Sequence, residues 1–416
     1  MSYDARIRQK WKAKVLSWTS PLQTSHSRPV AKLCAEVTLG ILSSGSLQLS
    51  EIARALKEPT RLHHTLKRLS RMLGKHALWE ELENQLLARL SWQVNEEMVL
   101  AIDPGDLNRD GSAKSECISR VHDGSCGEIV GGYPLIEVVG RDVRKRVTLP
   151  LLCRLYSYKE KGFVSENEQI INVMRQVSKA IKGKRLWVID RGGDRIKLWK
   201  AWEKDKFDVL VRITDQRHWV RSGKKQSLSE IVRQVPLKHK GKLRYGSKKE
   251  IHFALTKVTL PEYPEWPLTM IIVKHGKQEP MVLVSSRSGR GRRQGEKLIQ
   301  SYMDRWSCEE GYRFTKQGFS LEQVMARSYT TLRNLVALAA VSWALLSEDQ
   351  HGSHELIERG KRQKKNKKLK FPFYSLLKGW QSLFAEAKDI FYTRFRQKTK
   401  ETARRQLFLP ALIPKL

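Results

Sequence analysis

Two aspartates at matching positions could take part in metal-dependent cleavage of a phosphodiester bond. Asp103 follows a short apolar run at 98–102, and Asp190 follows another at 185–189. Each run predicts a buried strand that carries a carboxylate at its end. Cleavage with metals needs two or three carboxylates that converge on ions about 3.5–4 Å apart. The two motifs therefore suggest one metal site, although an Asp that caps a strand or a following helix explains each pattern equally well.

A sharper motif follows the spacing Y-x2-R-x3-E-x6-K and consists of Tyr302, Arg305, Glu309 and Lys316. These residues lie in a predicted helix at 294–317. At about 100° per residue, the four side chains fall within an arc of about 60°. The cations of this stripe can pair with phosphate oxygens, and Glu309 can ligate a metal. The alternative is a surface helix with ordinary charge pairs, such as Arg305 with Glu309.

The two aspartates need elements that hold them side by side. The chain between residues 98 and 213 predicts a β-β-β-α-β-α-β order, with strands at 98–102, 133–140, 146–157, 185–189 and 208–213 and helices at 166–181 and 194–203. The first and fourth strands can be neighbours in a mixed five-stranded sheet. Asp103 and Asp190 would then lie at one edge of that sheet.

A strand-rich segment separates the second Asp from the Glu. Residues 216–288 predict strands at 251–260, 270–275 and 281–286, and we interpret the segment as a β insertion. Two long helices are predicted to follow, at 294–317 and 320–346. The second Asp and the Glu would therefore lie close together in the fold, although this insertion separates them in the sequence.

Both ends of the chain predict helices and basic surfaces. In the helical first 95 residues, segments 50–56 and 62–69 form a predicted helix-turn-helix, whose second helix would place Lys67 and Arg68 against phosphates. A basic helical hairpin that contacts no DNA is the alternative. Segment 359–370, RGKRQKKNKKLK, contains eight basic residues and no acidic one. It predicts either a phosphate contact or a solvated loop.

Composition favours a polyanionic partner. The 416 residues include 78 Lys and Arg against 43 Asp and Glu, a formal net charge of +35. Such a charge favours nucleic acid, with RNA or anionic lipid as alternatives to DNA. The five cysteines form no C-x-x-C pair, and no run of about 18 apolar residues occurs. We expect a protein of a reducing cytoplasm that does not act in a membrane.

The motifs resemble those of bacterial cut-and-paste transposases of the insertion-sequence 4 family. LAIDPGD contains Asp103, VIDRGGD contains Asp190, and the Y-x2-R-x3-E-x6-K signature contains Glu309. The order of the motifs and the insertion also match, so the resemblance covers about residues 98–346. It implies an RNase H-like core in which these three carboxylates bind two Mg²⁺ ions, for which Mn²⁺ can substitute.

The resemblance also implies partners and a reaction. Tyr302, Arg305 and Lys316 would grip terminal phosphates of double-stranded DNA, and a homodimer would pair two transposon ends. Activated water would free a 3′-hydroxyl, which could form a hairpin with the opposite strand and later attack target DNA. Such enzymes tend to flip a terminal base onto a Trp. Trp219 and Trp266 lie in the insertion, but either also fits a core position.

One departure from the family pattern lies next to Asp190. Gly193 in VIDRGGD stands where an aromatic residue is expected. We expect this glycine to loosen the packing behind Asp190. The three carboxylates themselves are all present.

The sequence thus predicts an α/β protein with an RNase H-like catalytic core. The predicted parts are an all-helical DNA-binding domain at 1–95, the core at 96–215 and 289–348, the β-strand insertion at 216–288, and a basic helical C-terminal region at 349–416. The expected function is cut-and-paste transposition of an insertion sequence, in the bacterial cytoplasm at the nucleoid. A catalytically inactive DNA-binding repressor and a domesticated RNase H-like nuclease are the alternatives.

Overall fold

The computed structural model describes residues 3–385 and 387, except for 113, 125–126, 143, 146, 246, 277, 349–353 and 361–370. The chain divides into two compact units. One, which we call the helical unit, comprises Met1–Leu78 and Lys316–Leu416; the other, the sheet unit, comprises Trp79–Thr315. The five-part division drawn from the sequence remains a prediction about domains.

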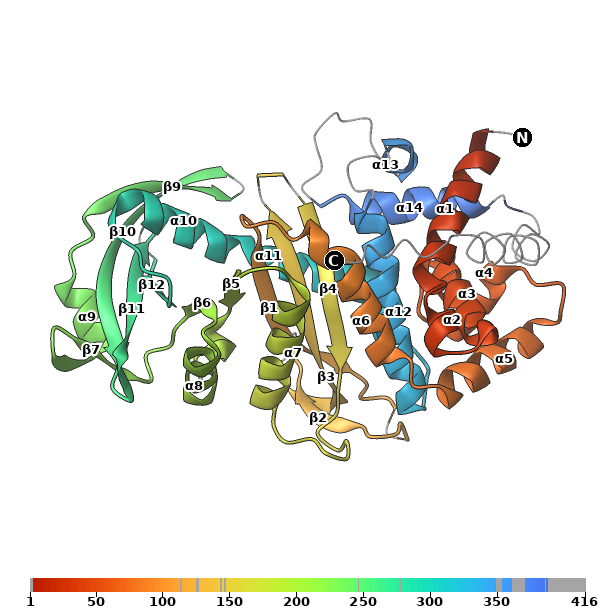
Figure 1. Cartoon of the computed structure of the whole chain (residues 1–416), viewed down its shortest axis with the longest axis horizontal. Coiled ribbons are helices and arrows are strands. Elements are labelled where there is room, and N and C mark those ends of the chain that lie inside the picture. Colours follow the sequence, from red (N-terminus) through yellow and green to blue (C-terminus); the bar gives the residue numbers. More distant parts are fainter. Residues whose placement is uncertain are drawn as a thin grey trace, which may run out of the picture. The chain divides into compact units, whose positions relative to one another are not determined.

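The sheet unit is built on one 12-stranded mixed sheet (Figure 1). Its strands are β1 (Val99–Asn108), β2 (Ser119–His122), β3 (Ile129–Asp142), β4 (Val147–Leu155), β5 (Leu186–Ile189), β6 (Asp208–Arg212), β7 (His218–Arg221), β8 (Lys224–Ser227), β9 (His239–Tyr245), β10 (Ser247–Leu260), β11 (Tyr263–Lys274) and β12 (Met281–Ser285). Its helices are α6 (Trp79–Leu90), η1 (Ser91–Gln93), α7 (Glu166–Ala180), η2 (Arg191–Gly193), α8 (Ile196–Asp205), α9 (Leu228–Gln234), α10 (Gly291–Asp304) and most of α11 (Trp306–Gly318). The fold is therefore a mixed α/β fold with a large mixed sheet.

Five strands form the central part of the sheet. β1 pairs antiparallel with β3, and β3 pairs antiparallel with β4. On its other side β1 pairs parallel with β5, which pairs parallel with β6. The order β4-β3-β1-β5-β6 therefore places the first and fourth predicted strands side by side, as the sequence indicated. β2, which pairs with β3, was not predicted.

The predicted insertion extends the same sheet. β12 pairs antiparallel with β6, and β11 and β10 continue the order outward. Between β6 and β10 the chain also forms α9, whose N-terminus carries a capping box from Ser227 and Glu230. The segment is thus joined to the core through strand pairing, and it contains a short helix that alternation of apolar residues did not predict.

The strand that carries Asp103 does not end at that residue. β1 pairs with β3 as far as Asn108, so Asp103 lies in the middle of the strand. The sequence predicted a strand that ends at this carboxylate. Pairing with β5 ends at Ala101, so one edge of β1 is open beyond it. A proline is tolerated on such an edge because its missing N–H removes no ladder hydrogen bond there.

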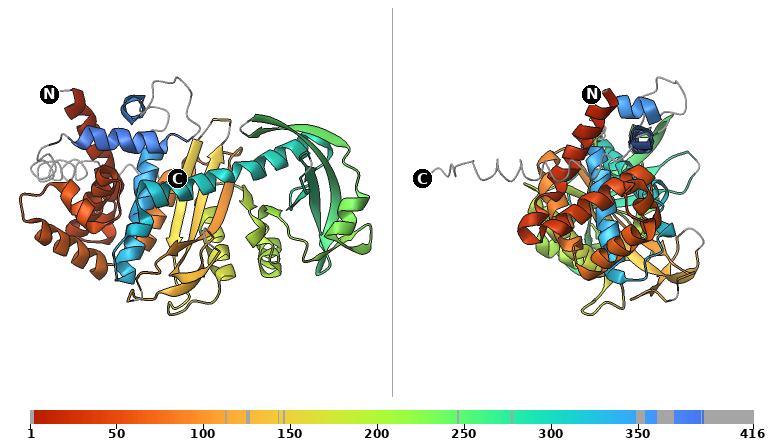
Figure 2. Two further views of the ribbon diagram at one scale, coloured as in Figure 1. Left: turned by 180° about the vertical axis from the view of Figure 1, so that it is seen from behind. Right: turned by 90° about the vertical axis from the view of Figure 1, so that its right-hand side faces the viewer.

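The predicted helix at 294–317 is two helices. α10 ends at Asp304, and α11 begins at Trp306. The N–H of Arg305 donates to the Tyr302 carbonyl (3.1 Å), and that of Cys308 donates to the Arg305 carbonyl (2.7 Å). Both bonds span three residues, which tightens the chain at Arg305. The two helices follow one another closely (Figure 2). Likewise, the predicted helix at 320–346 is η3 (Leu321–Gln323) followed by α12 (Tyr329–Ser347).

The helical unit combines both ends of the chain. Its helices are α1 (Tyr3–Thr19), α2 (Leu22–Ser25), α3 (Arg28–Ser44), α4 (Leu49–Leu56), α5 (Leu62–Lys75), η3, α12, α13 (His354–Gly360) and α14 (Phe373–Ala385). By length and composition α12 could span a membrane, but 89% of its apolar window is buried in the protein. It is the core helix of this unit, packed against α3, α5 and α14. Residues 361–370 of the predicted basic arm lie outside the described residues.

Candidate active site

Strand pairing brings the two aspartates together. The parallel ladder between β1 and β5 ends at the pair Ala101 and Val188. Asp103 and Asp190 each lie two residues beyond that pair, so they are neighbours where the two strands separate. Asp190 caps η2, because its Oδ1 accepts the Gly192 N–H at 2.8 Å. A backbone hydrogen bond therefore fixes the second carboxylate.

Helix α10 and the start of α11 place the glutamate beside them. Leu298, Ile299 and Tyr302 of α10 belong to a buried core cluster with residues of β1, β5, β6 and β10–β12. The Cys308 thiol lies 3.8 Å from the carbonyl oxygens of Ala101 and Glu137. The first turn of α11 therefore packs on β1 and β3, which brings Glu309 to the face that carries Asp103.

Arg305 lies among the three carboxylates. Its Nη1 is 3.7 Å from Asp103 Oδ1, and its Nη2 donates to Glu309 Oε1 at 2.5 Å. The Arg305 side chain is 9% exposed, whereas the side chains of Asp103 and Glu309 are 21% and 30% exposed. The break between α10 and α11 falls at this residue. The stripe predicted from helical spacing thus brings Arg305 and Glu309 together with Asp103.

Burial and mutual repulsion disfavour the ionised form of Asp103. Burial raises the pKa of Asp103 to about 7; the Arg305 guanidinium opposes this rise, and the charges of Asp190 and Glu309 add to it. Burial therefore outweighs the attraction of the Arg305 guanidinium, and Asp190 and Glu309 add a smaller repulsion. A divalent cation would relieve the remaining repulsion.

The residues fit a magnesium or manganese site by chemistry. The three carboxylates supply oxygen donors only, the type that these hard cations prefer. As they stand, no three His, Cys, Asp or Glu side chains within the described part of the chain are grouped closely enough to hold a metal ion. Arg305 spans the space between two of them, so the carboxylates could close around metal only after this side chain turns away.

Tyr302 lies beneath Arg305 and not at the surface. Its side chain is 4% exposed and belongs to the core cluster of α10. The Arg305 guanidinium carbon is 5.7 Å from the centre of the ring. Burial raises the pKa of the Tyr302 hydroxyl, while the positive charges of Arg305 and Arg212 lower it. The phenol therefore supports Arg305, and the sequence had not indicated this buried position.

The remaining predicted DNA contacts lie in the helical unit. The Lys316 ammonium is 2.7 Å from Glu322. Lys67 on α5 is exposed, which suits the predicted phosphate contact. Arg68 instead contacts two carboxylates, Glu36 at 2.8 Å and Glu58 at 2.5 Å. These pairs give Arg68 a structural role between α3 and α5, so Lys67 is the better placed of the two for DNA.

Three residues at the site were missed in the sequence. Glu137 stands opposite Asp103 in the ladder between β1 and β3 and is 1% exposed. Trp306 begins α11 directly after Arg305 and is 38% exposed. Arg212 ends β6, and its charge acts on Tyr302. Only Trp306 carried a sequence signal, because an aromatic beside a predicted phosphate-binding Arg can stack on a base.

The tryptophans of the insertion pack on helix α8. Trp219 is fully buried and, like the half-buried Trp266, makes an edge contact with Trp199. Asp194 supports this cluster, because it accepts a hydrogen bond from the Trp199 indole and pairs with Arg217 at 2.8 Å. Asp194 is therefore a buried anchor of this cluster, and the N-cap position of α8 is occupied by Arg195.

Gly193 does not loosen the packing behind Asp190. A Cβ atom at this glycine would lie 2.4 Å from Ile189 Cγ2. The residue is buried, so the close approach of η2 to β5 leaves no room for the aromatic that the family pattern suggested.

Residues 155–345 match the family model described as the transposase DDE domain. The match supports a DDE transposase. It contains Asp190, Arg305 and Glu309, whereas Asp103 lies before its first residue. The match does not distinguish the insertion-sequence 4 family from other DDE transposases.

Two solved structures are similar to this chain at a low level. One is the cryo-EM structure of the piggyBac transposase synaptic complex with hairpin DNA, which is 14% identical in sequence. The alignment covers 98% of the present chain and 84% of the piggyBac chain, with a TM-score of 0.41. The crystal structure of the NurA nuclease from Sulfolobus solfataricus is 13% identical, with coverages of 66% and 96% and a TM-score of 0.22. Both TM-scores are too low to show a shared fold. No curated protein matches the chain.

Proposed function

We propose that this protein is a transposase of the insertion-sequence 4 type, which cuts DNA at the ends of a mobile element and joins them to target DNA. The observation that carries the proposal is the convergence of Asp103, Asp190 and Glu309 around Arg305. The order β4-β3-β1-β5-β6, with β1, β5 and β6 parallel, supports an RNase H-like core. The transposase-domain match supports the reaction class.

Each residue of the site has a proposed task. Asp103, Asp190 and Glu309 would hold two Mg²⁺ ions, with Mn²⁺ as a substitute. When bound, the ions activate water and stabilise the leaving oxygen. Arg305, freed from its carboxylates, would pair with a phosphate of the DNA. Tyr302 would keep Arg305 in position from below.

Double-stranded DNA is the proposed partner, as element ends and as target. The formal charge of +35 favours a polyanion. Trp306 could stack on a base next to the cleaved bond, and Lys67 and Lys316 could contact phosphates. Pairing of two ends would require a homodimer. The reaction would take place in the cytoplasm, at the bacterial nucleoid, and would include a hairpin if the freed 3′-hydroxyl attacks the opposite strand.

The proposal can be tested by metal-dependent nicking of a duplex that carries the inverted repeat flanking the coding sequence. We expect cleavage by the wild type with Mg²⁺ and at least about 10³-fold slower cleavage by Glu309→Gln with unchanged DNA binding. Glu310→Gln is the matched control, because Glu310 is the next residue and pairs with Arg313 instead. It should cleave at the wild-type rate.

The alternatives give different results in the same experiment. A repressor would bind the repeat without cutting it in Mg²⁺ or Mn²⁺. A domesticated nuclease would cut but would not join the freed 3′-hydroxyl to a target plasmid. Equal cleavage by Glu309→Gln and the wild type would remove the three carboxylates as the site of the reaction.

A further inference from the structure

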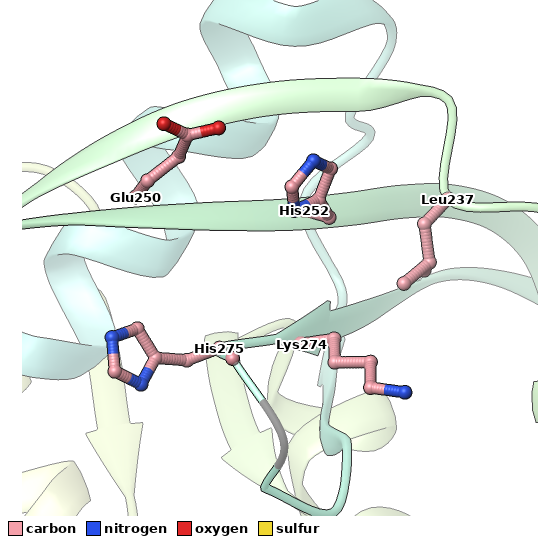
Figure 3. Close-up of a pocket in the computed structure, with 6 residues that line it drawn as sticks. Leu237, Glu250, His252, Lys274 and His275 are labelled. Carbon is pink, nitrogen blue, oxygen red and sulfur yellow. The ribbon is translucent and has the colours of Figure 1, made fainter.

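A hollow opens on the part of the sheet unit formed by β10 and β11. Its volume is about 560 Å³, and it is lined by Leu237, Glu250, His252, Lys274, His275 and Gly276. Figure 3 shows Glu250 and His252 rising from one strand and Lys274 and His275 from its neighbour. Four of the six lining residues thus carry ionisable side chains, three of them basic.

Strand register arranges basic side chains in a row beside this hollow. His252 of β10 pairs with Lys240 of β9 on one side and with Lys274 of β11 on the other. Directly opposed residues project to the same face of a sheet, with Cβ atoms about 4.5–5.5 Å apart. We call the row Lys240, His252 and Lys274 the basic ladder. Lys240 and Lys274 are exposed, and His252 is half-buried.

The other face of these strands is already covered. Phe253 is fully buried, and a Cβ atom at Gly295 of α10 would lie 2.3 Å from its ring. His239 of β9 packs on the same ring at 5.2 Å between centroids. Because successive residues of a strand alternate in direction, the basic ladder faces away from α10. The next opposed pair on this face, Ala254 and Ile272, is buried, so the basic ladder lies at the solvent-exposed end of the face.

The basic ladder concentrates positive charge. Lys240 and Lys274 lie on either side of His252, two strand spacings or about 10 Å apart, so their charges repel weakly. Two residues along β10, on the same face, the register places Lys242 opposite Glu250, a complementary pair. Across the described part of the chain, no carboxylate forms an ion pair with Lys240 or Lys274. An external anion would offset this repulsion.

We propose that the basic ladder binds the sugar–phosphate backbone of DNA. The three strands span about 10 Å, along which one DNA strand carries about three phosphates. The ladder lies in a segment where fifteen Lys and Arg stand against five Glu between residues 216 and 288. The inference rests on the proposed function only in that DNA is the partner, because the ladder shares no residue with the three carboxylates.

The test compares charge-neutral variants in fluorescence anisotropy with a labelled 30-base-pair duplex. We expect Lys240→Gln/Lys274→Gln to raise Kd roughly tenfold and to lower the slope of log K against log salt by about 1–2. The control Lys224→Gln/Lys257→Gln removes two exposed charges, of which Lys257 lies on the other face of β10. It should change Kd by at most about twofold. Glu250→Gln should strengthen binding, because it removes a negative charge beside the phosphates.

The outcomes separate this inference from the proposed function. If the ladder and control variants lose affinity equally, or if Glu250→Gln weakens binding, the ladder is not a specific contact and the proposal is wrong. If the ladder variant loses affinity while Glu309→Gln cuts DNA as fast as the wild type, the ladder stands and the catalytic assignment fails. Circular dichroism of each variant confirms that the sheet is intact.

Discussion

At the scale of single residues, Arg305 acts as the counter-ion of the candidate site. It contacts Asp103 and Glu309, and the charge of Asp190 also acts on it. A guanidinium and a metal ion require the same carboxylate oxygens, so they compete. Metal binding would therefore release Arg305 towards a phosphate. Under the proposed function, release of this side chain would couple metal binding to a contact with a DNA phosphate.

Asp103→Asn should stabilise the metal-free protein while abolishing cleavage. Burial raises the pKa of Asp103 from 3.8 in a free side chain to about 7. The folded state then holds a proton that the unfolded state has lost, so the free energy of unfolding falls as pH rises from about 4 to about 7. Asn avoids this loss. We expect about 1–4 kcal/mol of added stability at pH 8, measured by chemical denaturation with EDTA.

The same variant tests metal binding. Mg²⁺ should raise the melting temperature of the wild type, because a ligand of the folded state stabilises it, and should leave Asp103→Asn unchanged. An equal rise in both proteins would mean that the ions bind elsewhere. A fall in stability of Asp103→Asn at pH 8 would contradict the assignment of burial as the dominant effect.

Glu137→Gln should remove a second pH-dependent loss of stability. Burial raises the pKa of Glu137 well above its ordinary value, and the charge of Asp103 adds to the rise. Thr315 donates to its Oε1 at 3.3 Å, and Oε2 has no hydrogen-bond partner in the described part of the chain. Ionisation in the unfolded state therefore lowers stability as pH rises above about 4.5.

The measurement is the melting temperature of Glu137→Gln and the wild type between pH 5 and pH 9. We expect the two curves to diverge with rising pH, with the variant melting at the higher temperature, which corresponds to roughly 1–3 kcal/mol in the free energy of unfolding at pH 9. Cleavage should persist, because Gln keeps the shape beside Asp103. Parallel curves would show that Glu137 does not hold a proton in the folded protein.

At the scale of elements, two glycines let α13 and α14 touch through their backbones. A Cβ atom at Gly360 would lie 1.8 Å from the Ser375 carbonyl oxygen, and one at Gly379 would lie 1.9 Å from that of Leu356. Real Cβ atoms do not approach backbone so closely. The crossing therefore depends on both glycines, and it fixes the chain on each side of residues 361–370.

Gly379→Ala should separate these two helices. The added methyl group meets backbone atoms that cannot rotate away, and overpacking of this kind costs roughly 1–3 kcal/mol or more. We expect a lower melting temperature and faster proteolysis near α13. Gly111→Ala is the control, since a Cβ atom there has nothing within 4 Å. Equal melting of Gly379→Ala and the wild type would mean that the crossing is not needed.

Local sequence patterns predicted an element well where a single local property, such as an apolar run, determines it. The apolar runs before Asp103 and Asp190 gave β1 and β5, and their parallel pairing followed from the order of elements. The continuation of β1 past Asp103 was not predicted. The strand tolerates Pro104 only because β5 separates from β1 before this residue, which is a tertiary property. The break at Arg305 was not predicted either, because the spacing of the apolar and charged residues is continuous across it.

At the scale of the whole molecule, the positive charge predicts strongly salt-dependent DNA binding. A formal net charge of +35 implies many phosphate contacts and counter-ion release. If about six to ten phosphates are contacted, affinity for a non-specific duplex should fall about 10³–10⁵-fold between 50 and 200 mM salt. Anisotropy titrations at four salt concentrations measure the slope. A flat response, with an unchanged melting temperature as control, would contradict an electrostatic interface.

The candidate site was predicted in part because its chemistry lies in local spacing, along the segment that forms α10 and α11 and at the strands β1 and β5. The roles of Arg68 and Tyr302 were not predictable in this way. Arg68 meets Glu36, which lies 32 residues earlier, and Tyr302 is buried by strands that precede it by up to two hundred residues. Residue type and period carry no information on such partners. Long-range packing decides which of two equally basic or aromatic side chains faces solvent.

The helical unit also sets an order of events during synthesis. α3 packs against α12 and α14, which are made almost three hundred residues later, whereas the sheet unit lies on one continuous stretch of chain. At about 5–20 residues per second, α3 waits roughly 15–60 s for its partners. The sheet unit can fold during that time, so the helices that carry Lys67 would be completed last. A ribosome that stops early would release a protein with a folded sheet and an unfinished DNA-reading unit.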